Sequence, residues 1–422
     1  MKRYIVTLFL GLCIAGWQGC KKYDIEPLVN DPSYIRVFNN LTPTLDVIHG
    51  SQSTPFLTFL LDPITDASGT AADAAIIGDY LGTRQLFSLS YAANEANSSV
   101  GNSTTGPNNQ LDPPNLTPVN YEYPGNAHVL TAPVINGFDL SAWAQIPAGR
   151  HRIVFIRRPQ NGIDFKSLSA TIRNGVLLDT TVNFEKGEVY TLEVLSRDLD
   201  NNKYGLYIRK EQFVHQSFEA DKLYVGFTNL SGATTADVRN GFKVAFSDRI
   251  KVVGSYFKYN DAASSPEHLE VFYNAIAGYD NTYFTTIGTR MDTTISFYPL
   301  PMLPQSDFFY QGLLRRYAPS KRTFVSDQGS LPYTRFIFTD ADAPVFEYNG
   351  IGYKLECSAD PAVYNNNNPF TTGAMFDAPN LNMIVNNNGK YYIYPTLNIM
   401  ELVYDRVYMM QIVRGFEQLP QN

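Results

Sequence analysis

Apolar and polar residues alternate over short runs along most of the chain, and this period of two predicts β-strands. The clearest runs lie at 34–39 and 150–155 in the first half and at 224–229 and 334–338 in the second. Pro147-Ala148-Gly149 supplies a turn directly before the second of these runs. Many short strands separated by turn residues are typical of β-sandwiches, so we expect an all-β, mainly antiparallel fold.

Helical periodicity is weak, and two segments predict a short helix. Ala71–Tyr80 is the better candidate, and Glu267–Ala275 is the other. Residues 92–120 are rich in Asn, Ser, Thr, Gly and Pro, which predicts a long surface loop inserted between strands.

Similar segments in the two halves indicate an internal repeat. The runs at 34–39 and 224–229 both open with Tyr and a β-branched residue, and both end in Asn before a turn that contains Leu. The strand pattern at 184–195 is echoed at 404–413. Repeats of this length predict two β-sandwich-like domains in tandem. The expected boundaries are a signal peptide at 1–19, a flexible tether at 20–33, a first domain at 34–216 that contains the 92–120 insertion, and a second domain at 221–422.

The composition favours the same fold and disfavours one class of partner. Of the 422 residues, 44% are hydrophobic and 14% aromatic, whereas 17% are charged. Aromatic side chains suit pleated, half-buried surfaces. The formal net charge of -7 is opposite in sign to the concentrated positive field that phosphate binding needs. We therefore expect no nucleic-acid partner.

The first twenty residues predict export. Lys2-Arg3 precedes an apolar stretch, Ile5–Ile14, that is shorter than the roughly 20 residues of a membrane-spanning helix, which is the form of a secretory signal peptide. Gly19-Cys20 follows, and the segment resembles a bacterial lipoprotein signal, although Trp17-Gln18 stands where that family usually has Leu and a small residue. The resemblance implies that Cys20 carries lipid and becomes the first residue of the mature chain.

The cysteine count fits this interpretation. Cys13 would leave with the signal and Cys20 would carry lipid, so Cys357 would have no disulfide partner. We expect Cys357 to be a small buried residue in a strand.

Three segments of the first half together resemble a known family. They are the strand 34–39, the Ile-Pro-Ala-Gly turn and strand at 146–155, and the run 179–191, which opens with Asp-Thr-Thr and ends with Tyr-Thr. They resemble small β-sandwich domains of unknown function that recur, often in tandem, in lipoproteins of Bacteroidota. The second half resembles these domains at its opening strand, 224–232. The resemblance implies the fold and an envelope location, and it carries no chemistry.

No pattern in the sequence predicts catalysis, a cofactor or a metal site. The five histidines are dispersed and form no His-Glu-x-x-His motif. Asp198–Asn202 resembles the start of a calcium loop, but Lys203 and Arg209 occupy the positions that need Gly and Glu, so we favour a hairpin turn. The paired carboxylates of a glycan hydrolase stay open as an alternative, because such residues meet only in the fold.

Aromatic residues are the candidates for binding a glycan, because sugar rings stack on exposed aromatic faces. Trp143 would be the single tryptophan of the mature chain, and Tyr392 and Tyr394 would share one face of a strand. Core packing is the favoured alternative for all three residues.

These observations favour a non-enzymatic lipoprotein of the outer membrane that acts as a binding or accessory module. Its expected partners are the membrane, through the lipid on Cys20, and a glycan, an outer-membrane transporter or another envelope protein. Asp24 and Glu26 resemble the acidic residues that direct such lipoproteins to the outer face, so we favour surface exposure. The alternative is a fimbrillin-like structural subunit that polymerises by strand donation. An envelope glycan hydrolase is the third hypothesis.

Overall fold

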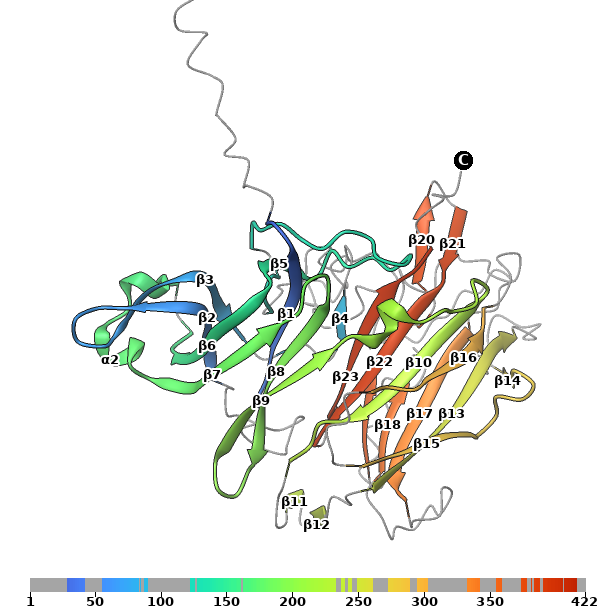
Figure 1. Ribbon diagram of the computed structural model, residues 1–422. Coiled ribbons are helices and arrows are strands. Elements are labelled where there is room, and N and C mark those ends of the chain that lie inside the picture. Colours follow the sequence, from blue (N-terminus) through green and yellow to red (C-terminus); the bar gives the residue numbers. More distant parts are fainter. Residues whose placement is uncertain are drawn as a thin grey trace, which may run out of the picture.

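The computed structural model shows an all-β protein built from several sheets, which confirms the predicted fold class (Figure 1). Among the described residues, the single α-helix, α2 (Ala170–Arg173), has four residues, and no helix is long and apolar enough to cross a membrane. The structure describes residues 29–41, 55–82, 84, 87–89, 122–125, 127–160, 162–232, 237–239, 242–244, 249–260, 272–288, 294–302, 332–341, 354–358, 373–377, 381, 383–387, 390–404 and 406–415.

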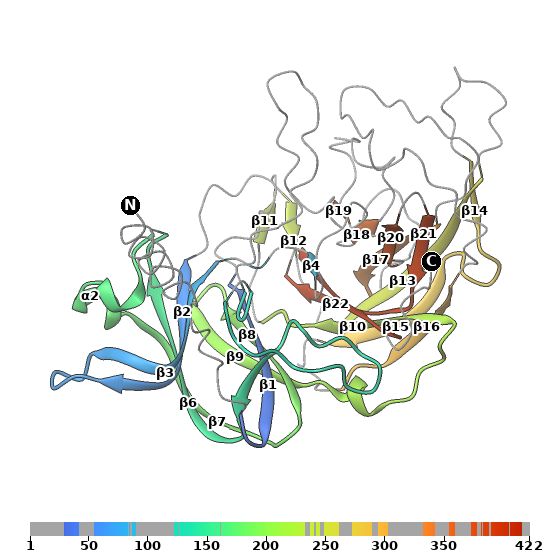
Figure 2. The same ribbon diagram turned by 90° about the horizontal axis from the view of Figure 1, so that it is seen from above.

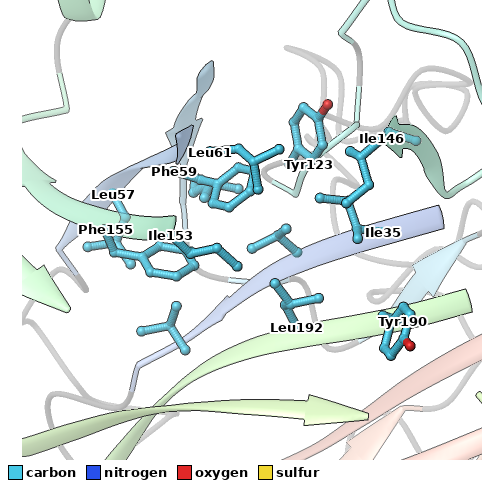
Figure 3. Close-up of a cluster of buried hydrophobic side chains, with 14 of the residues drawn as sticks. Ile35, Leu57, Phe59, Leu61, Tyr123, Ile146, Ile153, Phe155, Tyr190 and Leu192 are labelled. Carbon is cyan, nitrogen blue, oxygen red and sulfur yellow. The ribbon is translucent and has the colours of Figure 1, made fainter. Parts of the chain in front are cut away.

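The first half of the chain forms two sheets that pack face to face. Their strands are β1 (Pro32–Asn40), β2 (Phe56–Thr65), β3 (Ala71–Leu81), β5 (Ala144–Pro147), β6 (Gly149–Arg158), β7 (Val176–Phe184), β8 (Val189–Asp198) and β9 (Lys203–Lys210). One sheet has the order β5-β1-β8-β9, in which β1 and β8 run parallel, and the other has the antiparallel order β3-β2-β6-β7. Apolar side chains such as Ile35, Phe59 and Leu192 fill the space between the two sheets (Figure 3).

The second half forms a similar pair of sheets around its own apolar core. Their strands are β4 (Phe87–Leu89), β10 (Lys222–Asn229), β13 (Arg249–Asn260), β14 (Phe272–Ala275), β15 (Thr282–Gly288), β16 (Phe297–Pro301), β17 (Pro332–Asp340), β18 (Lys354–Ser358), β19 (Gly373–Asp377), β22 (Thr396–Val403) and β23 (Arg406–Val413). One sheet has the order β16-β10-β22-β23-β4, and the other has the order β14-β13-β17-β18-β19 with β15 also on β13. Two small ribbons pair β11 (Asp237–Arg239) with β12 (Phe242–Val244) and β20 (Met383–Asn387) with β21 (Lys390–Tyr394).

One sheet of each half repeats the same topology. In both, an antiparallel edge strand, a strand from the start of the half, a parallel strand and an antiparallel strand follow one another, as β5-β1-β8-β9 and as β16-β10-β22-β23. Asn39 is the last residue but one of β1 and Asn229 is the last residue of the equivalent strand β10, and each side chain accepts a hydrogen bond from the backbone N–H two residues further on. The Asn that the two sequence runs share therefore makes the same turn in both halves.

The two repeated sheets also pack on each other, so the four large sheets lie in four layers (Figures 1 and 2). Phe38 and Val189 from the first half share one buried apolar cluster with Leu397 and Ile412 from the second. The central strands of the two middle layers, β1, β8, β10 and β22, are therefore buried along most of their length, and every residue of β22 is buried.

Two sequence predictions about helices are wrong. Ala71–Tyr80 forms β3, because pairing with β2 supplies its backbone hydrogen bonds and overrides the helix propensity of its alanines. Gly78 in this strand lies against the Tyr123 ring, which a Cβ would approach to 2.9 Å. In the second predicted helix, Phe272–Ala275 forms β14, and residues 267–271 lie outside the described residues, as does the predicted insertion at 92–120.

Candidate functional site

A layer of charged side chains lies between the two repeated sheets. Ile35, Leu192 and Ile208 face the first-half core, so the alternation of a strand turns their neighbours Arg36, Glu193 and Arg209 to the opposite face, toward the second half. We call this cluster the charged layer; its members are Arg36, Arg84, Glu122, Glu193, Arg209, Glu211 and Glu401.

Glu401 joins the two halves within the charged layer. Its Oε2 accepts a hydrogen bond from Arg84 Nη1, and its Oε1 lies 2.6 Å from Arg209 Nη1. The three side chains are at most 1% exposed. Because Glu401 belongs to the second half and both arginines belong to the first, the carboxylate is neutralised only while the two halves are packed together.

Glu193 shares the same two arginines at longer distances. Its Oε1 lies 3.4 Å from Arg209 Nη1, and its Oε2 lies 3.8 Å from Arg84 Nη1. Its shortest hydrogen bond comes from a neutral group, because Asn40 Nδ2 donates to Oε2 at 2.5 Å. Glu193 is therefore less well neutralised than Glu401.

The remaining members extend the charged layer along β9 and β1. Glu211 Oε1 accepts hydrogen bonds from Arg209 Nε at 3.0 Å and from Thr191 Oγ1 at 2.5 Å. Arg36 Nη2 lies 2.5 Å from Glu122 Oε1.

An aromatic ring contacts two of the cations. The guanidinium carbons of Arg84 and Arg36 lie 3.8 Å and 4.7 Å from the centre of the Phe38 ring. Aromatic faces attract cations, so Phe38 stabilises both guanidinium groups in a site that excludes water.

Burial and the neighbouring charges shift the pKa values of the carboxyl groups in different directions. Burial, followed by the charge of Glu401, raises the pKa of Glu193 to about 8. Burial also raises the pKa of Glu211. Burial opposes the ionisation of Glu401 too, but Arg84 and Arg209 outweigh it, so the pKa of Glu401 lies below its ordinary value. Of these three carboxyl groups, Glu401 is therefore the one that ionises most readily.

The charged layer binds the halves to each other and offers no surface to a soluble ligand. Its most exposed member, the Glu122 side chain, is 7% exposed. Within the described part of the chain, no three His, Cys, Asp or Glu side chains are grouped so that they could hold a metal ion.

The residues predicted to bind a glycan lie on different elements. Trp143 is fully buried between the middle layers, with its ring centre 5.2 Å from the Arg36 guanidinium carbon. It has no exposed face for a sugar, so the core-packing alternative describes its position. Tyr392 and Tyr394 lie in β21, opposite Val385 and Met383 of β20. Cys20, the predicted lipid attachment site, lies outside the described residues.

Other polar residues that the sequence singled out have local partners. Asp198 caps the β8–β9 turn, where its carboxylate accepts hydrogen bonds from the backbone N–H and the side chain of Asn201. His151 bridges Asp62 and the Pro147 carbonyl, and His215 lies 2.8 Å from Glu188. Cys357 lies in β18, opposite Phe336 of β17.

Sequence reasoning missed the charged layer, although a signal for it was present. Glu193 and Glu401 each interrupt an apolar strand, in Tyr-Thr-Leu-Glu-Val-Leu and Asn-Ile-Met-Glu-Leu-Val. A charged residue within a buried strand requires a partner of opposite charge. The partners come from other strands, so the sequence could indicate the need but not the pairing.

Comparisons with known proteins leave the family open. No family model matches the chain, and no curated protein matches it. Among solved structures, the chain is similar to the tip fimbrial protein Mfa3 from Porphyromonas gingivalis with C-terminal truncation, at 9% identity over 91% of this chain and 100% of that chain. The TM-score is 0.15, which is too low to relate the two folds or to carry over a role.

Proposed function

We propose that this chain is a lipid-anchored outer-membrane protein, exposed at the cell surface, that acts as a non-enzymatic binding or accessory module. One observation carries the proposal: a positively charged start, a short apolar stretch and Gly19-Cys20. Acyl chains on Cys20 would hold the protein on the membrane, because each buried methylene contributes about 0.8 kcal/mol.

The start of β1 suits a protein held by a tether. The side chains of Asp31 and Lys186 lie 2.5 Å apart, and the Asp31 and Pro32 carbonyls accept hydrogen bonds from the N–H groups of Ala148 and Gly187. These contacts fasten the beginning of the first sheet to two neighbouring turns. Of the predicted tether at 20–33, residues 20–31 precede β1, and fully extended they would reach about 40 Å. The turns that contact Asp31 and Pro32 therefore lie next to the point where the tether would meet the fold.

The stacked sheets support a binding role rather than a flexible linker role. A rigid scaffold positions the loops between its strands, and such loops are where recognition residues concentrate. The partner that we propose is a glycan, an outer-membrane transporter or another envelope protein.

Metabolic labelling with an alkyne-tagged fatty acid tests the anchor. We expect the wild-type protein to take up the label and to fractionate with the outer membrane, and Cys20→Ala to lose both properties. Cys13→Ala is the matched control and should behave as wild type. A labelled Cys20→Ala protein, or an unlabelled wild type, contradicts the proposal.

A glycan array probed with the chain from residue 21 onward tests the binding role directly. Binding to a defined glycan class at micromolar concentration supports a glycan-capturing module. If nothing binds, co-purification of the lipidated protein with an outer-membrane transporter is the next outcome that would support an accessory role.

The fimbrillin-like alternative rests on an open edge. In the described part of its sheet, β7 pairs with β6 on one side and is the last strand. An edge strand of nine residues offers unpaired backbone groups for strand addition. Ladders that resist SDS without heating would favour this alternative, and a single monomer band would count against it.

A further inference from the structure

Glu193 and Glu401 occupy the same position in the two repeated sheets. Glu193 lies opposite Phe38 of β1, and Glu401 lies opposite Thr228 of β10, the strand equivalent to β1. Because equivalent faces of the two sheets pack on each other, the two carboxyl groups meet the same two arginines.

The geometry distinguishes the two carboxyl groups. Glu401 contacts both guanidinium groups closely, whereas Glu193 lies 3.4 Å and 3.8 Å from them and takes its shortest hydrogen bond from the Asn40 amide. Two carboxylates in one buried site cannot both ionise without a large cost. The closer contacts assign the negative charge to Glu401 and leave Glu193 as the group that holds a proton.

The number of charges in the layer leads to the same assignment. Its cations are Arg36, Arg84 and Arg209, and its carboxyl groups are Glu122, Glu193, Glu211 and Glu401. Three positive groups face four acidic groups, so one proton on one carboxyl group makes the layer neutral. An uncompensated charge in such a site would cost several kcal/mol.

We propose that Glu193 is a proton-binding site that locks the two halves together: it holds one proton in the folded protein, and loss of that proton weakens the contact between the two repeated sheets. The charged and titratable groups that face it are Arg84 ahead of β4, Tyr207 and Arg209 of β9, Glu211 after β9, and Glu401 of β22. Arg36 and Glu122 complete the layer beside β1.

The direction of the pH dependence follows from the protonated state. The pKa of Glu193 in the folded protein, about 8, lies above its ordinary value of 4.5, so unfolding releases a proton between these two values. The stability that Glu193 contributes is full below pH 4.5 and is lost as the pH rises through about 8. The release of one proton changes the unfolding equilibrium constant about tenfold per pH unit in this window.

Urea unfolding of the chain from residue 21 onward tests the proposal, with the fluorescence of Trp143, its single tryptophan, as the readout. We expect the free energy of unfolding of the wild type to fall between about pH 5 and about pH 8, and the slope of this fall to contain the contribution of one released proton. Glu193→Gln mimics the protonated carboxyl group, so it should remove one proton from the slope and be more stable than wild type at alkaline pH. Glu185→Gln, whose side chain is 61% exposed, is the matched control and should leave the slope unchanged.

Glu401→Gln tests whether the two equivalent carboxyl groups have different roles. It leaves Arg84 and Arg209 without their anion, so it should lower stability at every pH. Equal losses from Glu193→Gln and Glu401→Gln, or a wild-type slope in Glu193→Gln, would overturn the proposal.

A measurement on the wild type covers the case in which a variant does not fold. The infrared C=O stretch of a buried, protonated carboxyl group should be present at about pH 6 and should disappear, with a red shift of Trp143 fluorescence, as the pH passes about 8. A spectrum without this band at about pH 6 would equally overturn it. Lipid labelling is independent of this result, so either proposal can fail alone.

Discussion

At the scale of single residues, the position of a charge in a strand decides whether it faces a core or the other half of the molecule. Arg36 and Arg209 lie in strands whose alternate residues are apolar, and the pattern alone does not say which face meets water. The structure shows that neither arginine does, because the side chains of Arg36 and Arg209 are at most 1% exposed. Charges that a sequence reader would place on the surface are therefore buried and paired.

Arg209→Met should be among the most destabilising substitutions in the chain. It removes the cation that contacts Glu193, Glu211 and Glu401 and leaves buried carboxylates without compensation, which costs about 3–5 kcal/mol. Urea denaturation at neutral pH measures the loss. Arg152→Met is the control, because the Arg152–Asp179 pair is half-exposed and should contribute less than about 1 kcal/mol. Similar losses for both variants would show that burial of the pair does not matter.

Gly226 is the position in β10 equivalent to Arg36 in β1. A Cβ at Gly226 would lie 2.4 Å from Ile295 Cγ2 and 2.9 Å from the Phe297 ring, so the neighbours would have to shift. We expect Gly226→Ala to lower the free energy of unfolding by about 1–3 kcal/mol. Gly162→Ala has open space around its Cβ and should be nearly neutral. A neutral Gly226→Ala would mean that β10 and β16 are less closely packed than the structure shows.

At the scale of elements, the sequence predicted strands well where side chains alternate and failed where they do not. The runs at 34–39 and 224–229 lie in β1 and β10, which are topologically equivalent. The second repeat was paired with the wrong strand, because 406–413 forms β23, the counterpart of β9, whereas the strand of 184–195 is β8, which corresponds to β22. Both pairs of strands have similar apolar patterns, and only the hydrogen-bond partners distinguish them.

Substitution of Ala75 tests whether Ala71–Tyr80 is a strand, as in the structure, or a helix, as the sequence predicted. It is an exposed position of β3, so packing contributes little there and local propensity decides. Ala75→Val should stabilise the protein by up to about 1 kcal/mol, because β-branched residues favour strands. A helix at this place would instead lose up to about 0.7 kcal/mol. Thermal denaturation compares the variant with wild type, and Ala75→Gly should be less stable than both.

At the scale of the whole molecule, strand pairing and backbone hydrogen bonds join the two halves in addition to the chain that links them. β4, from the first half of the chain, is the last strand of a second-half sheet, where it pairs with β23 (Figure 1). The backbone N–H groups of Asp139 and Gly415 donate to the carbonyls of Val413 and Gly137, each at 2.9 Å. Sequence analysis could predict two sandwich-like units but not this exchange, because the pairing of segments hundreds of residues apart depends on the assembled fold.

These connections predict that the two halves unfold together. The charged layer, the apolar cluster around Phe38 and Leu397, and the β4–β23 pairing all cross from one half to the other. Separating the halves would expose buried carboxylates and apolar strand faces at the same time, so a state with one half folded is unfavourable. We expect far-UV circular dichroism, which reports on all strands, and Trp143 fluorescence, which reports on the middle layers, to give coincident urea transitions. Arg209→Met weakens the shared layer while leaving the two outer cores intact, so in this variant the fluorescence transition should precede the circular dichroism transition. Two separate transitions in the wild type would show that each half is stable alone and that the charged layer contributes little to joining them.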